Sequence, residues 1–134
     1  PFSRETTNFS AFEELMSYTD LILLDIKHID SNAHKQLTGW KNENILDCAR
    51  YLSDIKKPVW IRHVLVPGIN DDDDSLHKLR KFLDSLGNIE RVEVLAYHDL
   101  CVYKWEQLDL PYALSEVKPP TEENILHARK ILTE

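Results

Sequence analysis

The sequence has few of the residues that build phosphate-binding loops, metal centres and disulfide frameworks. Its 134 residues include only three glycines and two cysteines. The glycines are scattered, so no glycine-rich loop could cradle a phosphate, and no serine nucleophile elbow is present. Cys48 and Cys101 lie far apart without the spacing of metal ligands. We expect both to be free thiols in a cytoplasmic protein.

Charge and hydropathy exclude two further classes. The net charge of −7, without a basic stripe, argues against a general nucleic-acid-binding protein. No apolar run approaches the ~18 residues of a membrane span, and nothing resembles a signal peptide. With 43% apolar and 29% charged residues, residues 1–134 are expected to form one globular domain. Because the chain starts at Pro1 and its only methionine is Met16, we interpret it as an excerpt of a longer protein.

The sequence does contain a repeated alternation of apolar strands and amphipathic helices. Strands are predicted over 21–27, 59–66 and 91–97, and helices over about 8–19, 31–39, 44–54 and 76–86, with a last helix after Thr121. Ser31 and Thr121 are expected to cap helix starts, and Gly39 to end a helix. This order predicts an α/β fold of parallel βαβ units, either a (β/α) barrel or an open doubly wound sheet. Residues 98–120 are expected to be irregular.

Polar side chains end each of the three predicted strands: Asp25 and Lys27, then Arg62 and His63, then His98 and Asp99. The carboxyl ends of parallel strands lie on one side of a sheet, where ligands bind in α/β folds, so these groups could converge on one pocket. Asp25 and Lys27 are two residues apart and project from one face of a strand. A carboxylate that accepts and an ammonium that donates suit a ligand with hydroxyl groups. The alternative is that each group caps a strand or forms a local ion pair.

Adjacent residues of a strand face opposite ways, so Arg62 and His63 should have different surroundings. Arg62 shares a face with Trp60 and Val64, where a guanidinium needs an anionic or carbonyl partner, either within the protein or in a bound molecule. His63 is expected to pack against a helix. We interpret the run Asp71–Asp74 as a solvated helix start favoured by the helix dipole, and not as a metal site.

Four blocks of the sequence, taken in order, resemble a known family. They read YTDLILLDIKH (18–28), VWIRHVLVPG (59–68), VEVLAYH (92–98) and VKPPT (117–121). Together they closely resemble the carboxyl-terminal half of pyruvate formate-lyase activating enzymes. Those are radical S-adenosylmethionine (SAM) enzymes that install a glycyl radical on a partner protein. The resemblance covers nearly the whole chain from about residue 9.

The resemblance implies that this chain supplies the later strands of a partial (β/α)₆ barrel of TIM type. It also implies that Arg62 reaches toward the glycyl loop of the protein substrate. None of these residues would act as an acid or base, because the cofactor carries the chemistry. The SAM-binding roles that it implies are as follows: Asp25, Ile26 and Lys27 at the ribose, Val64 near the nucleoside and His98 against the adenine.

The chain departs from the family pattern in two places. The motif Cys-x₃-Cys-x₂-Cys, which holds the [4Fe–4S] cluster, is absent, as is the Gly-Gly-Glu segment that meets the methionine moiety. The resemblance assigns both to a missing amino-terminal half, and Cys48 and Cys101 cannot replace the motif. Ala96 and Cys101 also stand where similar enzymes have other residues, usually proline at the first position and glycine near the second.

The leading hypothesis is therefore the carboxyl-terminal part of a glycyl-radical activating enzyme. The full enzyme would cleave SAM reductively, with an electron donor such as flavodoxin, and abstract a hydrogen atom from a glycine of pyruvate formate-lyase or a related enzyme. The chain alone is predicted to be inactive, and its bare strand edge to promote self-association. The alternatives are a non-catalytic α/β binding or scaffold domain and an unrelated open α/β regulator.

Overall fold

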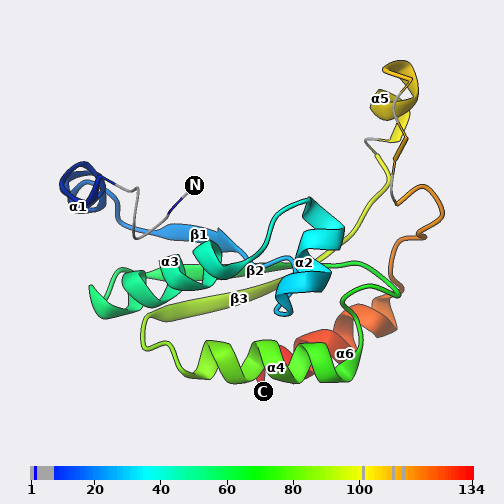
Figure 1. The fold of residues 1–134 in the computed structure, drawn as a ribbon. Helices are drawn as coiled ribbons and strands as arrows, with labels where there is room; N and C mark the ends of the chain where they lie inside the picture. The colour runs from blue at the N-terminus through cyan, green and yellow to red at the C-terminus, as the bar shows by residue number, and fades with distance from the viewer. Residues whose placement is uncertain (1, 3–7, 101, 110, 113) are drawn as a thin grey trace.

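The computed structural model describes residue 2 and residues 8–100, 102–109, 111–112 and 114–134. Within these residues, the strands β1 (Ile22–Asp25), β2 (Val59–Leu65) and β3 (Ile89–Ala96) form a parallel sheet in the order β1-β2-β3. The helices are α1 (Phe9–Ser17), α2 (Ser31–Thr38), α3 (Glu43–Asp54), α4 (Asp73–Asp84), α5 (Val102–Gln107) and α6 (Glu122–Thr133) (Figure 1). The predicted α/β fold with parallel βαβ units is confirmed.

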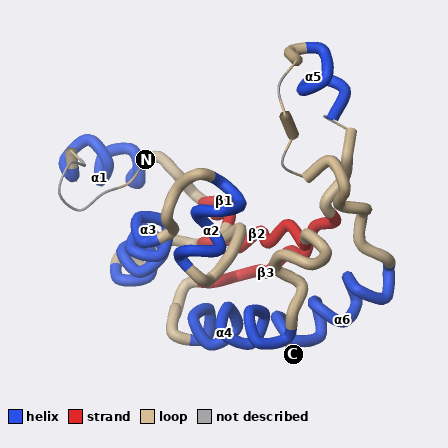
Figure 2. Tube along the Cα trace, turned by 45° about the vertical axis from the view of Figure 1, so that its right-hand side comes forward, coloured by secondary structure: helices blue, strands red, loops and turns tan. Residues whose placement is uncertain are grey.

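Helices α3, α4 and α6 pack against one face of the sheet, which we call the covered face (Figures 1 and 2). Burial alternates along β2: Val59, Ile61, His63 and Leu65 are buried, whereas the residues between them are only partly buried. Side chains from the three helices and the strands form one apolar cluster there, with Leu52, Leu79 and Leu132 among its fully buried members.

The opposite side of the sheet, which we call the open face, carries charged and exposed side chains. In a parallel pair, residues in register point to the same side of the sheet. The register therefore assigns these residues to the open face: Leu23 and Asp25 of β1, Trp60, Arg62 and Val64 of β2, and Arg91, Glu93 and Leu95 of β3. Leu23 is 51% exposed and Leu95 is 38% exposed, so the described helices leave much of this face open.

Two of the three predicted helix caps are confirmed, and one is wrong. Gly39 ends α2 with φ 84°, and Thr121 caps α6 in a reciprocal capping box with Asn124. The cap of α2 is Asp30 and not Ser31: the Asp30 carboxylate accepts from the N–H groups of residues 32 and 33 at 3.0 and 2.9 Å. Ser31 is already the first helical residue, so its hydroxyl is free to donate to Glu43 at 2.7 Å.

The acidic run lies at the start of α4, as the sequence predicted. Asp72 is the N-cap and accepts from the Ser75 N–H at 2.9 Å. Its neighbours also have partners within the protein: Asp71 with the N–H of Gly68, Asp73 with His127, and Asp74 with Lys78. Each of these carboxylates therefore has a partner within the protein.

The expectation for residues 98–120 is wrong in one part, because the six-residue helix α5 forms within them. In both views α5 stands away from the sheet, beyond an extended segment (Figures 1 and 2). The Trp105 ring of α5 lies 5.5 Å from the Tyr112 ring, centroid to centroid, so α5 contacts a residue that follows it in the chain. Periodicity could not predict a helix of fewer than two turns. Among the described helices, none combines the length and apolarity that crossing a membrane requires.

Candidate functional site

The structure brings together three of the predicted site residues at the carboxyl end of β1, beside the middle of β2. Arg62 is the central residue of β2, so the expectation that it ends this strand is wrong. Asp25 and Arg62 are in register on the open face. The Arg62 guanidinium donates twice to the Asp25 carboxylate, from Nε to Oδ1 at 2.9 Å and from Nη2 to Oδ2 at 3.1 Å. Lys27 Nζ lies 3.4 Å from Asp25 Oδ2. The three side chains thus form one charged group with one carboxylate and two cations.

This group is held in place but still open to a ligand. The side chains of Arg62 and Asp25 keep 35% and 34% of their surfaces exposed. An ionised carboxylate offers about four lone-pair sites, and the bidentate arginine and the lysine leave at least one of them for a hydroxyl donor. Of the two possibilities raised for Arg62, the structure shows the internal one: its partner belongs to the protein.

Val64 and His98 line a separate hollow at the end of β3. Its volume is about 390 Å³, and its other walls are Leu95, Ala96 and Tyr97. The Tyr97 hydroxyl lies 3.1 Å from that of Tyr112, and burial is the main reason why the pKa of Tyr97 rises to about 12. Asp25 and Lys27 line a different cavity, of about 470 Å³, together with α2 and α3 residues. Within the described residues, no hydrogen bond or ion pair joins His98 to the Asp25 group.

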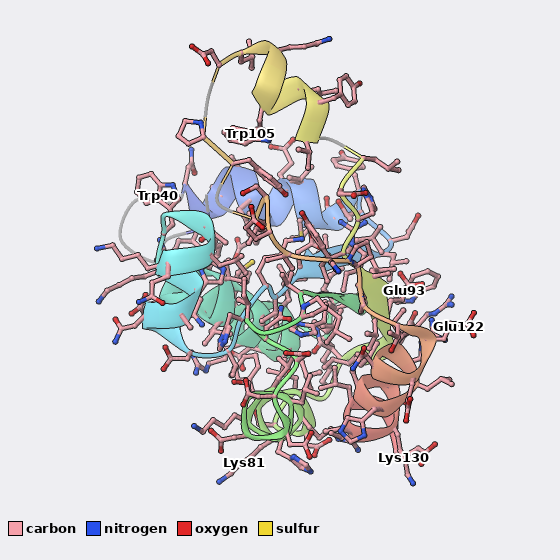
Figure 3. The ribbon with its side chains drawn as sticks, turned by 90° about the vertical axis from the view of Figure 1, so that its right-hand side faces the viewer. Trp40, Lys81, Glu93, Trp105, Glu122 and Lys130 are labelled. Carbon is pink, nitrogen blue, oxygen red and sulfur yellow. The ribbon has the colours of Figure 1, made fainter. Side chains whose placement is uncertain are left out.

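The open face carries a second set of charged and aromatic side chains on β2 and β3. Arg91 Nε lies 3.2 Å from Glu93, and the Arg91 guanidinium lies over the Trp60 ring at 4.9 Å from its centroid. Figure 3 shows Glu93 beside β3, and Trp40, which lines the 470 Å³ cavity, beyond the end of α2. Charged and aromatic groups therefore alternate over this face, which suits a polar occupant better than a purely apolar one.

His63 does not belong to this site, as predicted from the alternation of the strand. It is 2% exposed on the covered face, and its Nδ1 donates to the carbonyl of Ile26 at 2.8 Å. Burial lowers the pKa of His63. The ring is thus neutral, and it joins β2 to the segment that follows β1.

Sequence reasoning missed two buried amides that hold the site. Asn42 and Asn70 are each 1% exposed. Both donate from Nδ2 to carbonyls of the segment after β1. Single asparagines in loops carry no periodic signal, and Asn70 lies near Pro67-Gly68, where asparagine is also an ordinary turn residue.

The described residues do not fit an iron–sulfur cluster. They contain no group of three or more His, Cys, Asp or Glu side chains that could hold a metal ion. Cys48 is half-buried in α3, and burial raises the pKa of its thiol, which opposes formation of the thiolate that binds metal. Cys101, the other candidate that the sequence offered, lies outside the described residues.

Comparison with solved structures defines the class of fold. A radical SAM methyltransferase from Sphaerobacter thermophilus superposes with a TM-score of 0.61 at 19% identity, covering 91% of this chain and 34% of that one. A domain of pyruvate-formate lyase-activating enzyme from Bacteroides vulgatus superposes with a TM-score of 0.75 at 29% identity, covering 92% of this chain and 68% of that one. The three-stranded α/β arrangement is therefore one found in radical SAM proteins.

Sequence comparison identifies the family within that class. No protein-family model matches the chain. Pyruvate formate-lyase-activating enzymes from Streptococcus mutans and Staphylococcus epidermidis are 53% and 57% identical to it over 121 and 117 residues, which is 90% and 87% of this chain. The match is 46% and 47% of those enzymes, so the chain spans about half the length of the curated relatives that it matches. The chain is therefore homologous to about half of a pyruvate formate-lyase-activating enzyme, and the resemblance expected from the four sequence blocks is confirmed.

Proposed function

We propose that this chain contributes part of the SAM-binding wall of an enzyme that activates pyruvate formate-lyase. The observation that carries the proposal is the 53–57% identity to enzymes named for that activity. The charged group at the end of β1 supports it, because the resemblance assigns Asp25 and Lys27 to the ribose. We further propose that the three strands belong to a partial (β/α)₆ barrel whose interior includes the open face.

In this proposal, Asp25 accepts hydrogen bonds from ribose hydroxyls and Lys27 donates to ribose oxygens. Val64 and His98, which share a hollow, would lie against the nucleoside base. The side chain of Ile26 is fully buried, and its N–H and C=O are bonded to Arg62 and His63. Its proposed part is therefore to hold Asp25 and Lys27 on either side of it, without its own side chain touching the ligand.

Arg62 would serve the protein substrate. Its Nε and Nη2 are occupied by Asp25, while its Nη1 makes no hydrogen bond within the described residues. A backbone carbonyl near the target glycine could accept from Nη1 without breaking the ion pair. Pyruvate formate-lyase is the proposed partner, and the electron would come from a donor such as flavodoxin.

SAM and a [4Fe–4S] cluster would supply the radical chemistry in the longer protein, whose remaining length must contain the cluster ligands. Because the described residues do not fit the cluster, the chain by itself is proposed to be inactive. Its residues bind and orient SAM and exclude water from the nucleoside. The cytoplasmic location and the single domain over residues 1–134 stay predictions.

The test uses the gene product that contains this chain, reconstituted anaerobically with iron and sulfide. With SAM, a reductant and pyruvate formate-lyase, we expect 5′-deoxyadenosine and a glycyl radical detectable by electron paramagnetic resonance. Asp25→Asn should raise the KM for SAM about tenfold or more, as loss of a hydrogen bond to a charged group does. Asp47→Asn, which removes a carboxylate paired on the surface of α3, is the matched control and should change nothing.

Three outcomes would contradict parts of the proposal. Robust 5′-deoxyadenosine formation by the 134-residue chain alone would overturn its predicted inactivity. SAM cleavage without a glycyl radical on pyruvate formate-lyase would overturn the partner. A gene product without the three-cysteine motif would favour the non-catalytic scaffold.

A further inference from the structure

Four consecutive carbonyls after β1 each accept a hydrogen bond from a buried side chain. These carbonyls belong to residues 26–29, the segment that carries Lys27. The donors come from three places in the fold: His63 on β2 bonds the carbonyl of Ile26 at 2.8 Å, Asn70 after β2 bonds that of Lys27 at 2.8 Å, and Asn42 before α3 bonds those of His28 and Ile29 at 3.0 and 2.7 Å. This loop is therefore fixed by side chains where strand pairing no longer holds it.

Asn70 makes the most connections of the three donors. Its Nδ2 donates to the carbonyls of Lys27 at 2.8 Å and Val64 at 2.9 Å, and its Oδ1 accepts from the Val66 N–H at 2.7 Å. The residue is 1% exposed, so these bonds do not compete with water. A buried amide with three of its four hydrogen-bonding positions used is rigid, and losing it leaves several backbone groups unpaired.

The position of Asn70 explains why a side chain is needed there. The last main-chain bond from this segment to β2 runs from the Ile26 N–H to the Arg62 carbonyl at 3.0 Å. Beyond it, the amide of Asn70 spans the gap between Lys27 and Val64. The one amide group thus sets the spacing between Lys27, in the loop after β1, and Val64, on β2, which line different cavities.

We propose that Asn70 is a positioning residue that fixes Lys27 and Val64 relative to each other and so pre-forms the nucleoside site. This inference rests on the proposed function, in which those two residues contact SAM. Asn70 itself touches no ligand. The long lysine side chain can place its ammonium reproducibly only if its own backbone is held, and a loosened anchor lowers affinity without removing any contact group.

Asn70→Asp tests the donors while keeping the shape of the side chain. The new carboxylate can still accept from Val66, but it presents oxygen to two carbonyl oxygens, so both donor bonds are lost. Asn88→Asp is the matched control. The Asn88 amide donates to the Lys57 carbonyl at 2.7 Å, just before β2 and therefore at the other end of the sheet from the site.

Hydrogen exchange measures positioning without any ligand. The amides of Ile26 and Asp30, which are hydrogen-bonded on either side of Lys27, should exchange roughly tenfold faster or more in Asn70→Asp, the factor that loss of one or two buried hydrogen bonds gives. In Asn88→Asp they should be unchanged, whereas the Val59 amide, which donates to the Asn88 carbonyl, should speed up.

SAM titration of the reconstituted gene product then separates an effect on the position of Lys27 and Val64 from a general loss of protein stability. At temperatures where the two variants are equally folded, Asn70→Asp should bind SAM roughly tenfold more weakly than the wild type, as loss of an outer-shell partner does, and Asn88→Asp should match the wild type. Unchanged exchange at Ile26 and Asp30, or equal SAM affinity in both variants, would overturn the inference. A wild-type gene product that has been reconstituted with its cluster and still binds no SAM would count against the proposed function, and exchange would still decide the role of Asn70.

A measurement on the wild type covers the case in which Asn70→Asp does not fold. The side-chain amide protons of Asn70 should exchange far more slowly than those of the exposed Asn44, and should shift when SAM is added. Rapid exchange of the Asn70 amide would show that it does not hold the loop, and would refute the proposal.

Discussion

The two faces of the sheet differ most clearly at the adjacent residues Arg62 and His63. His63 lies on the covered face, 2% exposed, neutral, with one hydrogen bond to a main-chain carbonyl. Arg62 lies on the open face, with a third of its side chain exposed and a bidentate ion pair to Asp25. The same strand thus keeps charge only where water still reaches. The difference teaches that the covered face supplies stability, whereas the open face keeps charged groups accessible.

The handedness of the chain produces this difference. Right-handed crossovers that always move in one direction along a sheet keep their helices on one side of it. The order β1-β2-β3 has that property, and α3 and α4 are the crossover helices. Helices of this chain therefore cover one face of the sheet, whereas the open face stays accessible to another molecule or segment.

The largest expected effect comes from truncating a covered-face residue. Leu65→Ala, at a fully buried position, should lower the free energy of unfolding by about 2–5 kcal/mol, because it removes apolar contacts and leaves a cavity. Leu23→Ala, on the open face and 51% exposed, should cost less than about 1 kcal/mol. Urea unfolding followed by circular dichroism measures both. Equal costs would mean that the open face is buried in solution.

A second test compares buried and exposed histidines by pH. Burial lowers the native pKa of His63 below its usual 6.5, so the unfolded chain binds more protons in acid. The contribution of His63 to the free energy of unfolding is complete above pH 6.5 and is lost as the pH falls toward the native pKa. His63→Asn, which can still donate to the Ile26 carbonyl, should flatten the fall in the urea midpoint between pH 7 and 5. His77→Asn, at an exposed site on α4, should leave the pH dependence of the urea midpoint as it is in the wild type. A slope that survives in His63→Asn would contradict the assignment.

A smaller effect is expected for the ion pair of the open face. A double-mutant cycle with Asp25→Asn and Arg62→Gln should give a coupling of about 1 kcal/mol, reduced from that of a buried pair because both side chains are a third exposed. The pair of Asp47 and Arg50 on α3, with more exposed side chains, should give less than about 0.5 kcal/mol. The first coupling should weaken in 0.5 M salt. If the two couplings were equal, the register of β1 and β2 would add nothing to the pair.

The smallest expected effect is self-association through the unpaired outer edge of β1. β1 pairs only with β2 among the described strands, so its outer edge is bare, and Leu23 adds an exposed apolar group. Such edges favour pairing with a second copy. Light scattering should show weak, concentration-dependent association that Leu23→Lys reduces. Leu15→Lys, at an exposed position on α1, is the control and should have little effect. A strict monomer at high concentration would remove this prediction.

The sequence predicted most of the fold because its signals are local. Each helix with a long apolar stripe and each strand was found within a few residues of its observed bounds, as for α3 and β2. The errors lie where local signals compete or run out: Asp30 caps α2 in place of its neighbour Ser31, and the short helix α5 has no periodic stripe. Two acceptors side by side cannot be ranked without the backbone angles.

The candidate site was predictable in its residue types but not in its partners. Two charged residues interrupting an apolar strand marked Asp25 and Lys27. The bidentate bond from Arg62 depends on strand register, and the separate hollow of His98 depends on how β3 ends. Neither register nor hollow can be read from one strand alone.

By itself the sequence determined the order of strands and helices, the face on which each strand residue lies, and the family resemblance, because alternation and chirality are properties of the local chain. Only the tertiary structure decided that buried amides such as Asn70 hold the loop after β1, and that Arg62 turns to Asp25. Those contacts join residues about 40 positions apart, and a hydrogen bond forms only where folding has already set both its distance and its angle.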